Sequence, residues 1–253
     1  MSERLRDKKA LVTGSTSNIG RAIAEALAAQ GAHVVVSGRD AGRGAAVVEG
    51  IRARGGRADF VPADLDGSPE ASRALAEQAT AVLGGRIDVL VNNAGIYPPS
   101  TTTTVDEKTF DRVYAVNVKA PFFLTAALAP AMAEAGGGAI VNLGSWISRL
   151  GIPISALYSS TKGALETLTR AWAAEFGPAG VRVNAVSPGV VHEPSAQPHP
   201  GDVMMAGTPA GRFGTPEEIA LAVVYLAGDE ASFVHGVVLD VDGGRTTAAV
   251  IAR

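Results

Sequence analysis

The chain of 253 residues contains no cysteine and only four histidines. The missing thiols exclude disulfide bonds, thiol catalysis and cysteine-based metal sites. The histidines stand at positions 33, 192, 199 and 235, and no two of them form an HxxxH or HExxH pair, the spacing that places two imidazoles on one helix face. We therefore expect no metal centre.

The sequence also lacks a strong excess of either charge, because 22 basic and 25 acidic residues leave a formal net charge of −3. No basic stripe is present, so nucleic acid is not an expected partner. No apolar run appears long enough to cross a membrane, and the segment MSERLRDKK has no apolar core of a signal peptide. We expect a cytoplasmic protein that acts on a small molecule, with no membrane as partner.

What the chain does contain is a tyrosine and a lysine four residues apart, Tyr158 and Lys162, shortly after Ser145. Four residues make about one helical turn, so both side chains leave the same face, with Cβ atoms ~5–6 Å apart. The ammonium is expected to lower the tyrosine pKa from ~10 toward neutrality, where the phenol can exchange a proton. Ser145 adds a second hydroxyl. A solvated lysine beside a core tyrosine would show the same pair.

A glycine-containing turn follows the first apolar segment, in ALVTGSTSNIG at 10–20, and apolar residues then recur at helical spacing from Ile19 to Leu27. Gly14 permits a tight turn, and Gly20 lets the following helix pack close to a sheet. The open amides at the helix N-terminus can receive a pyrophosphate. The pattern predicts a dinucleotide site, although an ordinary strand-to-helix turn shares it.

Strand and helix patterns alternate along the whole chain. Strands are expected near 9–13, 33–37, 58–62, 87–91, 138–144, 181–186 and 236–240, and helices near 19–30, 40–54, 68–83, 106–134, 157–176 and 215–227. The alternation predicts an α/β fold, a doubly wound parallel seven-stranded sheet with helices on both faces, in a single domain over 1–253. Ligands bind beyond the carboxyl ends of such strands.

Five motifs in order resemble the short-chain dehydrogenase/reductase family over nearly the whole chain. TGSTSNIG at 13–20 is similar to its glycine motif, NNAG at 92–95 to its strand-end motif, and Asn117 to its helix asparagine. Ser145, Tyr158 and Lys162 stand at the family's catalytic spacing, and VNAVSPG at 183–189 matches the segment after its sixth strand. The resemblance implies a Rossmann-type fold and a nicotinamide cofactor.

The same resemblance implies the roles of four catalytic residues. Tyr158 would act as general acid/base, giving a proton when a ketone is reduced to a secondary alcohol and taking it in the reverse direction. Ser145 would hydrogen-bond the reacting oxygen, and Lys162 would bind the nicotinamide ribose while favouring the tyrosinate. Asn117 would support a water that links Lys162 to solvent.

The residues implied to bind the cofactor follow the ends of successive strands. They are Gly14, Ser15, Ser17, Asn18, Ile19, Gly20, Arg39, Asp64, Leu65, Asn92, Ala94, Gly95, Tyr158, Lys162, Pro188, Gly189 and Val191. Asn18 replaces the middle glycine of the motif, and asparagine tolerates left-handed backbone angles, so the turn should survive. Asp64 either receives the adenine amino group or is a helix N-terminal acid. Asn93 is expected to tie strands together.

Cofactor preference is expected from the end of the second strand, HVVVSGRD. Gly38 stands where NAD-preferring relatives carry an acid, and Arg39 follows it. A guanidinium can form charge-assisted hydrogen bonds with a 2′-phosphate, which favours NADP(H) over NAD(H). The alternative is that Arg39 stacks on adenine or lies in solvent. Ser17 occupies a position that is often basic in NADP-preferring relatives, so one cationic contact is missing.

Three short segments are expected to line the substrate pocket, with Ile96, Tyr97, Pro98, Trp146, Ile147, Ile152 and Ile154 as candidates. Trp146 is the best candidate for an aromatic side chain that faces the substrate, with plain core packing as the alternative. Few of these residues are charged, so an apolar or aromatic ketone is the expected substrate.

The segment 190–211 is expected to form a mobile lid over the substrate. Three prolines between 194 and 200 disfavour a continuous helix there. Glu193 stands where relatives usually have a threonine that contacts the nicotinamide, and we expect that it is not a tight cofactor ligand. His192 is interpreted as an exposed loop residue, with a substrate-facing position as the alternative.

These observations predict an NADP(H)-dependent oxidoreductase, a ketoreductase acting on a small ketone or alcohol. The alternative among enzymes is a 3-oxoacyl-carrier-protein reductase of lipid synthesis, which would favour a basic patch at the pocket mouth, where only Arg149 and Arg212 are candidates. An alternative of another class is a catalytically silent nucleotide-binding sensor. By resemblance, we expect a homotetramer, with a dimer as the alternative.

Overall fold

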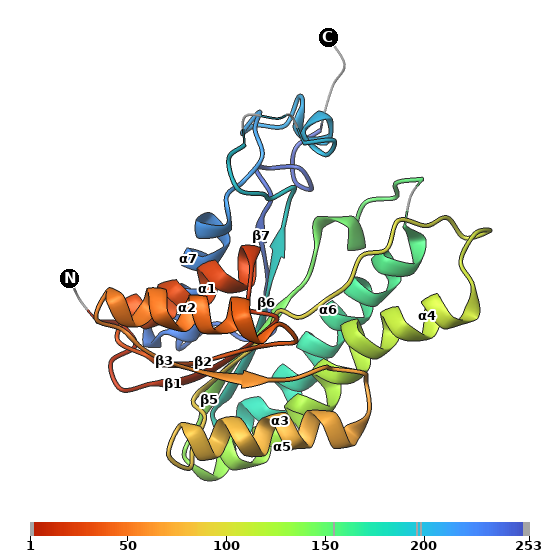
Figure 1. Ribbon diagram of the computed structural model, residues 1–253. Coiled ribbons are helices and arrows are strands. Elements are labelled where there is room, and N and C mark those ends of the chain that lie inside the picture. Colours follow the sequence, from red (N-terminus) through yellow and green to blue (C-terminus); the bar gives the residue numbers. More distant parts are fainter. Residues whose placement is uncertain (1–2, 154, 196, 198, 250–253) are drawn as a thin grey trace.

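One sheet of seven parallel strands runs through the computed structural model, which describes residues 3–153, 155–195, 197 and 199–249 (Figure 1). The strands are β1 (Lys9–Thr13), β2 (His33–Gly38), β3 (Arg57–Pro62), β4 (Val89–Asn92), β5 (Gly138–Leu143), β6 (Val181–Pro188) and β7 (Val238–Val241). Their order in space is β3-β2-β1-β4-β5-β6-β7, and every pairing is parallel. The predicted Rossmann-type fold is confirmed.

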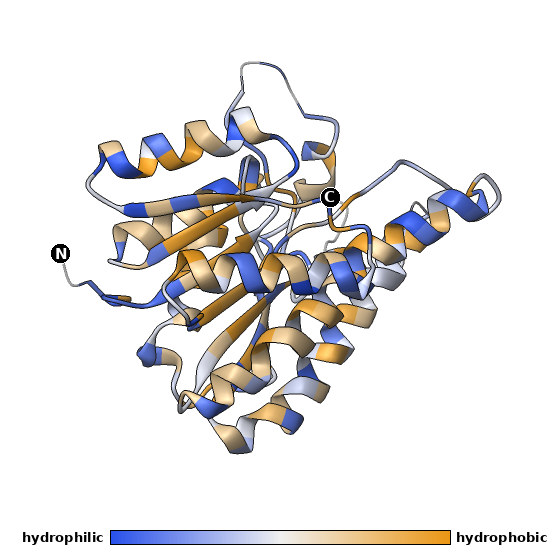
Figure 2. Cartoon of the chain, turned by 60° about the horizontal axis from the view of Figure 1, so that its bottom comes forward, coloured by the Kyte–Doolittle hydropathy of each residue, from blue (hydrophilic) through white to orange (hydrophobic). Residues whose placement is uncertain are grey.

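Helices form a layer on each face of the sheet. The layer of α1 (Asn18–Ala29), α2 (Ala41–Ala53) and α7 (Pro216–Ala227) packs on one face, and that of α3 (Pro69–Val82), α5 (Ala120–Glu134) and α6 (Ala156–Phe176) on the other. Side chains alternate along each strand, so Ala10 and Val12 join the first layer and Leu11 the second. Hydrophobic strands therefore lie at the centre, with hydrophilic positions on outer helices and loops (Figure 2).

The helix before β5 is longer than any other, because α4 (Glu107–Tyr114), a π-helical turn (Ala115–Lys119) and α5 run on continuously. An 18-residue window within Glu107–Glu134 has a mean hydropathy of 1.3, and half of that window is buried. By length and composition this helix could cross a membrane, which the sequence expectation had not allowed for. Ala120, Leu124 and Leu128 are buried against the sheet, as in the core helix of a globular domain.

The predicted strands and helices have ends within about two residues of the observed ones. The sequence did not predict the π-helical turn or the short 3₁₀ turns Trp146–Ser148 (η2), Gly177–Ala179 (η3), Asp202–Met205 (η4) and Asp229–Ala231 (η5). These segments are too short to show an apolar period. Two of them, the π-helical turn and η2, adjoin the site described below.

The start of α1 packs tightly against the turn after β1, and this packing positions the site. A Cβ added at Gly20 would collide with the Gly14 carbonyl and with Asn93 Nδ2. Neither group can move freely, because the Asn93 side chain donates hydrogen bonds to the carbonyls of Thr13 (2.8 Å) and Gly14 (3.0 Å).

Gly20→Ala is therefore expected to lower the free energy of unfolding by about 1–3 kcal/mol, as overpacking typically does. Gly50→Ala is the control, since the new Cβ in α2 would meet only the Arg54 guanidinium, at 3.8 Å. It should raise the free energy of unfolding by up to about 1 kcal/mol through helix propensity. Urea denaturation measures both, and a Gly20→Ala protein as stable as the wild type would contradict the packing argument.

Candidate active site

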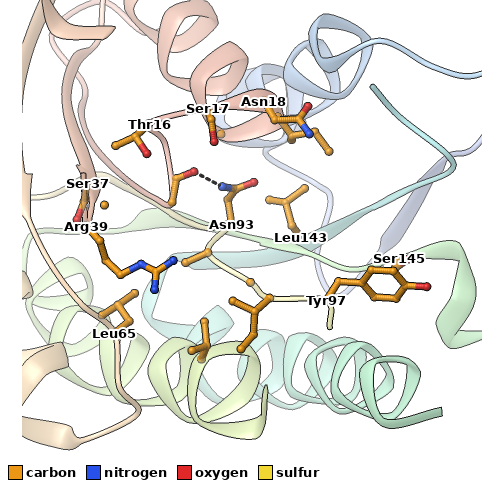
Figure 3. Close-up of a pocket in the computed structure, with 18 of the residues that line it drawn as sticks. Thr16, Ser17, Asn18, Ser37, Arg39, Leu65, Asn93, Tyr97, Leu143 and Ser145 are labelled. Carbon is orange, nitrogen blue, oxygen red and sulfur yellow. Dashed lines mark hydrogen bonds between the residues drawn. The ribbon is translucent and has the colours of Figure 1, made fainter. Parts of the chain in front are cut away.

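A cavity of about 480 Å³ lies at the carboxyl ends of the strands. Figure 3 shows Ser17 and Asn18 on one side, with Arg39 and Tyr97 across from them. Most of the predicted site residues line the cavity: Gly14, Ser17, Asn18, Ile19, Gly20, Arg39, Asp64, Leu65, Ala94, Gly95, Ile96, Tyr97, Ser145, Tyr158, Lys162, Pro188, Gly189 and Val191.

Several residues that line the cavity were missed: Thr16, Ser37, Asp40, Arg43, Ala63, Asn93, Arg112, Val116, Leu143 and Gly144. Thr16 lies inside the glycine motif, and Leu143 and Gly144 directly precede Ser145, so position beside a motif could have indicated them. Arg43 and Arg112 reach the cavity from helices without any motif. Their long side chains could be placed only once the helices were packed.

The turn between β1 and α1 forms a cradle for an anion. Gly14 has φ 63° and Asn18 has φ 47°, both left-handed, so the prediction that asparagine preserves the turn is confirmed. Ser17 at the N-cap of α1 makes no side-chain hydrogen bond to the helix amides. The amides remain open and no Cβ at 14 or 20 fills the space, so the cradle fits a pyrophosphate.

The side chains of Ser15 and Asn92, two of the predicted cofactor residues, do not line the cavity. Ser15 Oγ donates to the Val12 carbonyl (2.6 Å) and accepts from the Ser37 amide (2.9 Å), which joins β1 to β2. Asn92 Nδ2 donates to Asn142 Oδ1 on β5 (2.9 Å). Both side chains are buried and hold strands together. The prediction that these two side chains contact the cofactor is therefore corrected. A sequence motif does not reveal whether a polar side chain points into the cavity or into the sheet.

Asn93 has the role predicted for it. Its amide joins the end of β4 to Thr13 and Gly14, and Figure 3 shows a dashed hydrogen bond of the Asn93 side chain. Its side chain also borders the cavity. Asn93 thus connects β4 to the turn after β1 and also lines the cavity beside the cradle.

Ser145, Tyr158 and Lys162 meet at the other end of the cavity. Ser145 follows β5, whereas Tyr158 and Lys162 lie one turn apart on α6. Lys162 Nζ donates to the Leu143 carbonyl (2.7 Å) and lies 5.6 Å from the centroid of the Tyr158 ring. Tyr97 packs edge-on against Tyr158, with ring centroids 4.7 Å apart. The predicted juxtaposition of the three side chains is confirmed.

Burial dominates the acid-base properties of this group. It raises the pKa of Tyr158 to about 12, although the adjacent Ser145 hydroxyl acts to lower it. It also lowers the pKa of Lys162 to about 8. The expectation that Lys162 brings the Tyr158 pKa toward neutrality is therefore wrong for the free protein, because desolvation of the buried phenolate is the largest influence on this pKa. At pH 7 the phenol is protonated and the ammonium form of Lys162 predominates.

Asn117 lies in the π-helical turn, a rare conformation that often marks functional sites. Its Oδ1 accepts from the Ile96 amide (2.9 Å), and its Nδ2 donates to the Ile96 carbonyl (3.0 Å) and to Thr161 Oγ1 (3.1 Å). A Cβ added at Gly95 would lie 3.5 Å from Asn117 Oδ1 and 3.7 Å from Lys162 Nζ, so these two groups flank Gly95. The link from Asn117 through water to Lys162 stays a prediction.

The end of β2 opens onto the opposite end of the cavity. Arg39 is exposed, extends toward the cavity in Figure 3, and forms no ion pair with another residue in the described part of the chain. A Cβ added at Gly38 would lie 2.8 Å from Thr16 Cγ2, so any side chain at position 38 must displace Thr16. Position 38 therefore favours glycine over an acid for reasons of packing as well as of charge.

Two further arginines line the same end of the cavity, but carboxylates neutralise both. Arg43 Nε lies 2.9 Å from Asp40, and Arg112 Nη2 lies 2.8 Å from Asp64. Asp64 thus lines the cavity and also forms an ion pair with Arg112. Neither alternative proposed for it from the sequence had included this pairing.

Of the predicted substrate residues, Ile96 and Tyr97 line the cavity, whereas Pro98 and Ile152 are half-buried outside its lining. Ile154 lies outside the described residues. The backbone after β4 therefore supplies the apolar wall beside Tyr158.

Trp146 and Ile147 are corrections, since both are buried in η2 and do not line the cavity. The Arg245 guanidinium lies over the Trp146 ring, 5.2 Å from its centroid. The alternative reading of Trp146 as a packing residue is the one that the structure supports. Trp146 is the first residue of the 3₁₀ turn that follows Ser145, and a single sequence does not show such a turn.

The first residues of the predicted lid, Val190 and Val191, are held by backbone contacts with Gly214. Val191 pairs with Gly214 in an isolated parallel bridge, and the Gly214 amide donates to the Val190 carbonyl (2.9 Å). Glu193 lies 2.6 Å from Arg21 of α1 and does not line the cavity. That Glu193 is not a tight cofactor ligand stays a prediction. Mobility of the lid stays a prediction.

A cradle for a pyrophosphate at one end and a proton-exchanging group at the other define a dinucleotide-dependent oxidoreductase of Rossmann type. Comparisons with known proteins identify the family. A family model described as enoyl-(acyl carrier protein) reductase matches residues 14–246. The chain belongs to the short-chain dehydrogenase/reductase family, whose members use nicotinamide cofactors.

Curated relatives match the chain over nearly its whole length. An uncharacterised oxidoreductase of Methylorubrum extorquens is 42% identical, covering 95% of this chain and 98% of its own. Cyclopentanol dehydrogenase of Comamonas is 36% identical, covering 96% and 98%. Cis-4-hydroxycyclohexanecarboxylate dehydrogenase of Sinomonas cyclohexanicum is 39% identical, covering 97% and 99%. The chain is thus an oxidoreductase with alcohol dehydrogenases among its homologues.

Solved structures agree. One provisionally described as a β-ketoacyl-ACP reductase has 46% identity and a TM-score of 0.88, covering 96% of this chain and all of its own. A blue fluorescent protein from a metagenomic library, in complex with NADPH, has 35% identity and a TM-score of 0.89 over 97% and 100%. A gluconate 5-dehydrogenase from Burkholderia cenocepacia J2315, with NADP and tartrate, has 32% identity and a TM-score of 0.90 over 98% of each chain.

The lowered pKa of Lys162 predicts how cofactor affinity depends on pH. As pH rises through about 8, the buried ammonium loses its proton, and the cation that would bind the cofactor ribose is lost. Affinity for a nicotinamide dinucleotide should fall by up to about tenfold per pH unit above that value. Calorimetric titration from pH 6.5 to 9.5 measures it, with Lys162→Met as a weaker-binding control without this dependence. A flat wild-type profile would contradict the assignment.

Proposed function

We propose that the protein is an NADP(H)-dependent oxidoreductase that reversibly converts a ketone into a secondary alcohol. The observation that carries the proposal is the meeting of Ser145, Tyr158 and Lys162 in the cavity whose other end is the glycine cradle. A nicotinamide bound there would supply or accept the hydride. The name of one relative, cyclopentanol dehydrogenase, also supports a secondary alcohol as substrate.

The protonated state of Tyr158 suits it to donate a proton to a ketone oxygen. During reduction that oxygen gains negative charge, which Tyr158 and Ser145 can stabilise by hydrogen bonding from the same side. Lys162, held by the Leu143 carbonyl, keeps a positive charge close to the phenol. In the oxidation of an alcohol, Tyr158 must first lose its proton, and burial opposes that step.

Changing Tyr158 to Phe removes the proton donor and little else. Turnover should fall by ~10²–10⁴-fold, while the cofactor dissociation constant stays close to that of the wild type. Tyr97→Phe is the matched control, because it removes a hydroxyl from the ring that packs on Tyr158 and should keep most of the activity. Steady-state kinetics with cofactor titration separates these effects. Near-normal turnover of Tyr158→Phe would refute the assignment.

The preference for NADP(H) rests on Gly38 and Arg39. Arg39 lines the cavity without a carboxylate partner in the described part of the chain, unlike Arg43 and Arg112. Charge-assisted hydrogen bonds to a 2′-phosphate contribute ~1.5–3 kcal/mol, or roughly 10- to 150-fold in affinity. The complexes of two neighbours with NADPH and NADP support this preference.

Arg39→Ala should weaken NADPH binding by roughly 10- to 150-fold and NADH binding much less. Gly38→Asp should disfavour NADPH through repulsion of the 2′-phosphate, but its Cβ also displaces Thr16. Gly38→Ala is therefore the control, because its Cβ also displaces Thr16 but adds no negative charge. Calorimetric titration with both cofactors measures the changes. Equal losses for NADPH and NADH in Arg39→Ala would show that Arg39 stacks instead of contacting phosphate.

The second candidate is a 3-oxoacyl-carrier-protein reductase, which the description of one solved neighbour favours. An acidic carrier needs free basic groups at the cavity mouth. Arg149 hydrogen-bonds Asp240, and Arg212 pairs with Glu218 at 2.7 Å, so both predicted candidates are neutralised. A panel of free ketones and carrier-bound 3-oxoacyl thioesters, each with NADPH and NADH, decides between the two. Activity with none of them would instead favour a silent nucleotide sensor.

We also propose a homotetramer. Phe110 and Phe122 on the long helix are 47% and 43% exposed. Leu221 on α7 is 65% exposed, and Phe233, shortly after η5, is 100% exposed. Apolar side chains on two separate faces are what two kinds of subunit contact require. Light scattering after size-exclusion chromatography distinguishes a tetramer from a dimer. The cytoplasmic location stays a prediction.

A further inference from the structure

The lid brings together three groups that can bind a metal ion, although their sequence positions show no familiar spacing. His192, His199 and Asp202 each offer one ligand atom, and these atoms all lie within 4.8 Å of one another. His192 Nε2 lies 2.8 Å from Asp202 Oδ1. Helical geometry predicts no site from two histidines seven residues apart, but the described residues of the lid between them form no helix.

Backbone hydrogen bonds hold the second and third groups in place. Asp202 Oδ2 accepts from the His199 amide (3.0 Å), and the Asp202 amide donates to the His199 carbonyl (2.9 Å). The turn that starts η4 therefore fixes His199 and Asp202 relative to each other. A ligand pair set by its own backbone needs little reorganisation to bind an ion.

His192 reaches this turn from the start of the lid. Its ring lies between two others, with centroids 3.8 Å from Phe213 and 4.5 Å from His199. Its backbone amide donates to the Gly214 carbonyl (3.3 Å), next to the Val191 bridge. The imidazole is thus anchored on the part of the lid that borders the cavity.

The donor set indicates which ion would bind. Two imidazole nitrogens and one carboxylate oxygen suit a borderline ion such as Zn²⁺, whereas Mg²⁺ and Ca²⁺ prefer oxygen ligands throughout. Three protein ligands leave at least one coordination position for water.

We propose that the lid binds one Zn²⁺ per chain through His192, His199 and Asp202, and that the ion links His192 at the start of the lid to the turn formed by His199 and Asp202. The ion replaces the hydrogen bond between His192 and Asp202. Since Val191 lines the cavity and Glu193 holds Arg21 of α1, the ion stiffens the lid where it adjoins the cofactor cradle. This site goes beyond the proposed function and does not depend on it.

Zinc binding tests the site directly. Full-length protein is freed of metal with a chelator, dialysed, and titrated with ZnCl₂ by calorimetry, and we expect one ion per chain. His199→Ala and Asp202→Asn should each weaken binding by at least about tenfold. His235→Gln is the control, because it removes an exposed histidine outside the lid and should leave binding unchanged. Thermal unfolding of each metal-free variant checks that it remains folded.

Limited proteolysis tests the stiffening. Zinc should slow cleavage within 190–211 by about tenfold in the wild type and in His235→Gln, and should leave the rate unchanged in His199→Ala and Asp202→Asn. Absence of zinc binding, or equal binding by the lid variants and the wild type, overturns the site. Stoichiometric binding with unchanged cleavage overturns the stiffening.

Discussion

The cavity depends on the contact between the turn after β1 and the end of β4. Asn93 donates from β4 to the carbonyls of Thr13 and Gly14, and Gly20 leaves the space that this contact needs. β1 and β4 are neighbours in the sheet although β2 and β3 separate them in the chain, so the connections that follow them leave in opposite directions. The cradle and the opposite wall of the cavity both start from this junction.

At the catalytic end of the cavity, burial sets the pKa values of the two ionisable side chains. It raises the pKa of Tyr158 and lowers that of Lys162, so the free protein holds a neutral phenol beside a cation that is easily deprotonated. A Tyr158 able to take a proton at neutral pH requires a change in this environment. A cofactor and substrate bound in the cavity would change it by placing new charges and hydrogen bonds around both groups.

The lid is held by individual contacts, since η4 is its one regular segment in the described part of the chain. Glu193 has an ion-pair partner in Arg21, which neutralises the carboxylate beside the start of α1. Without that partner, a negative charge would stand close to the amides that receive a pyrophosphate. The pairing therefore lets an acid stand at position 193 beside the cradle.

The sequence by itself determined the fold class, the approximate ends of the strands and helices, and the one-turn pairing of Tyr158 with Lys162, to which the resemblance to the family added Ser145. Apolar periodicity, turn residues and one-turn spacing can be read from a sequence because each depends only on residues close together in the chain. Only the tertiary structure decided the protonation of Tyr158, the burial of Trp146 and Asn92, the pairing of Arg112 with Asp64, and the meeting of His192 with His199 and Asp202. Those outcomes depend on which groups exclude water from one another, and that follows from packing between segments far apart in the chain.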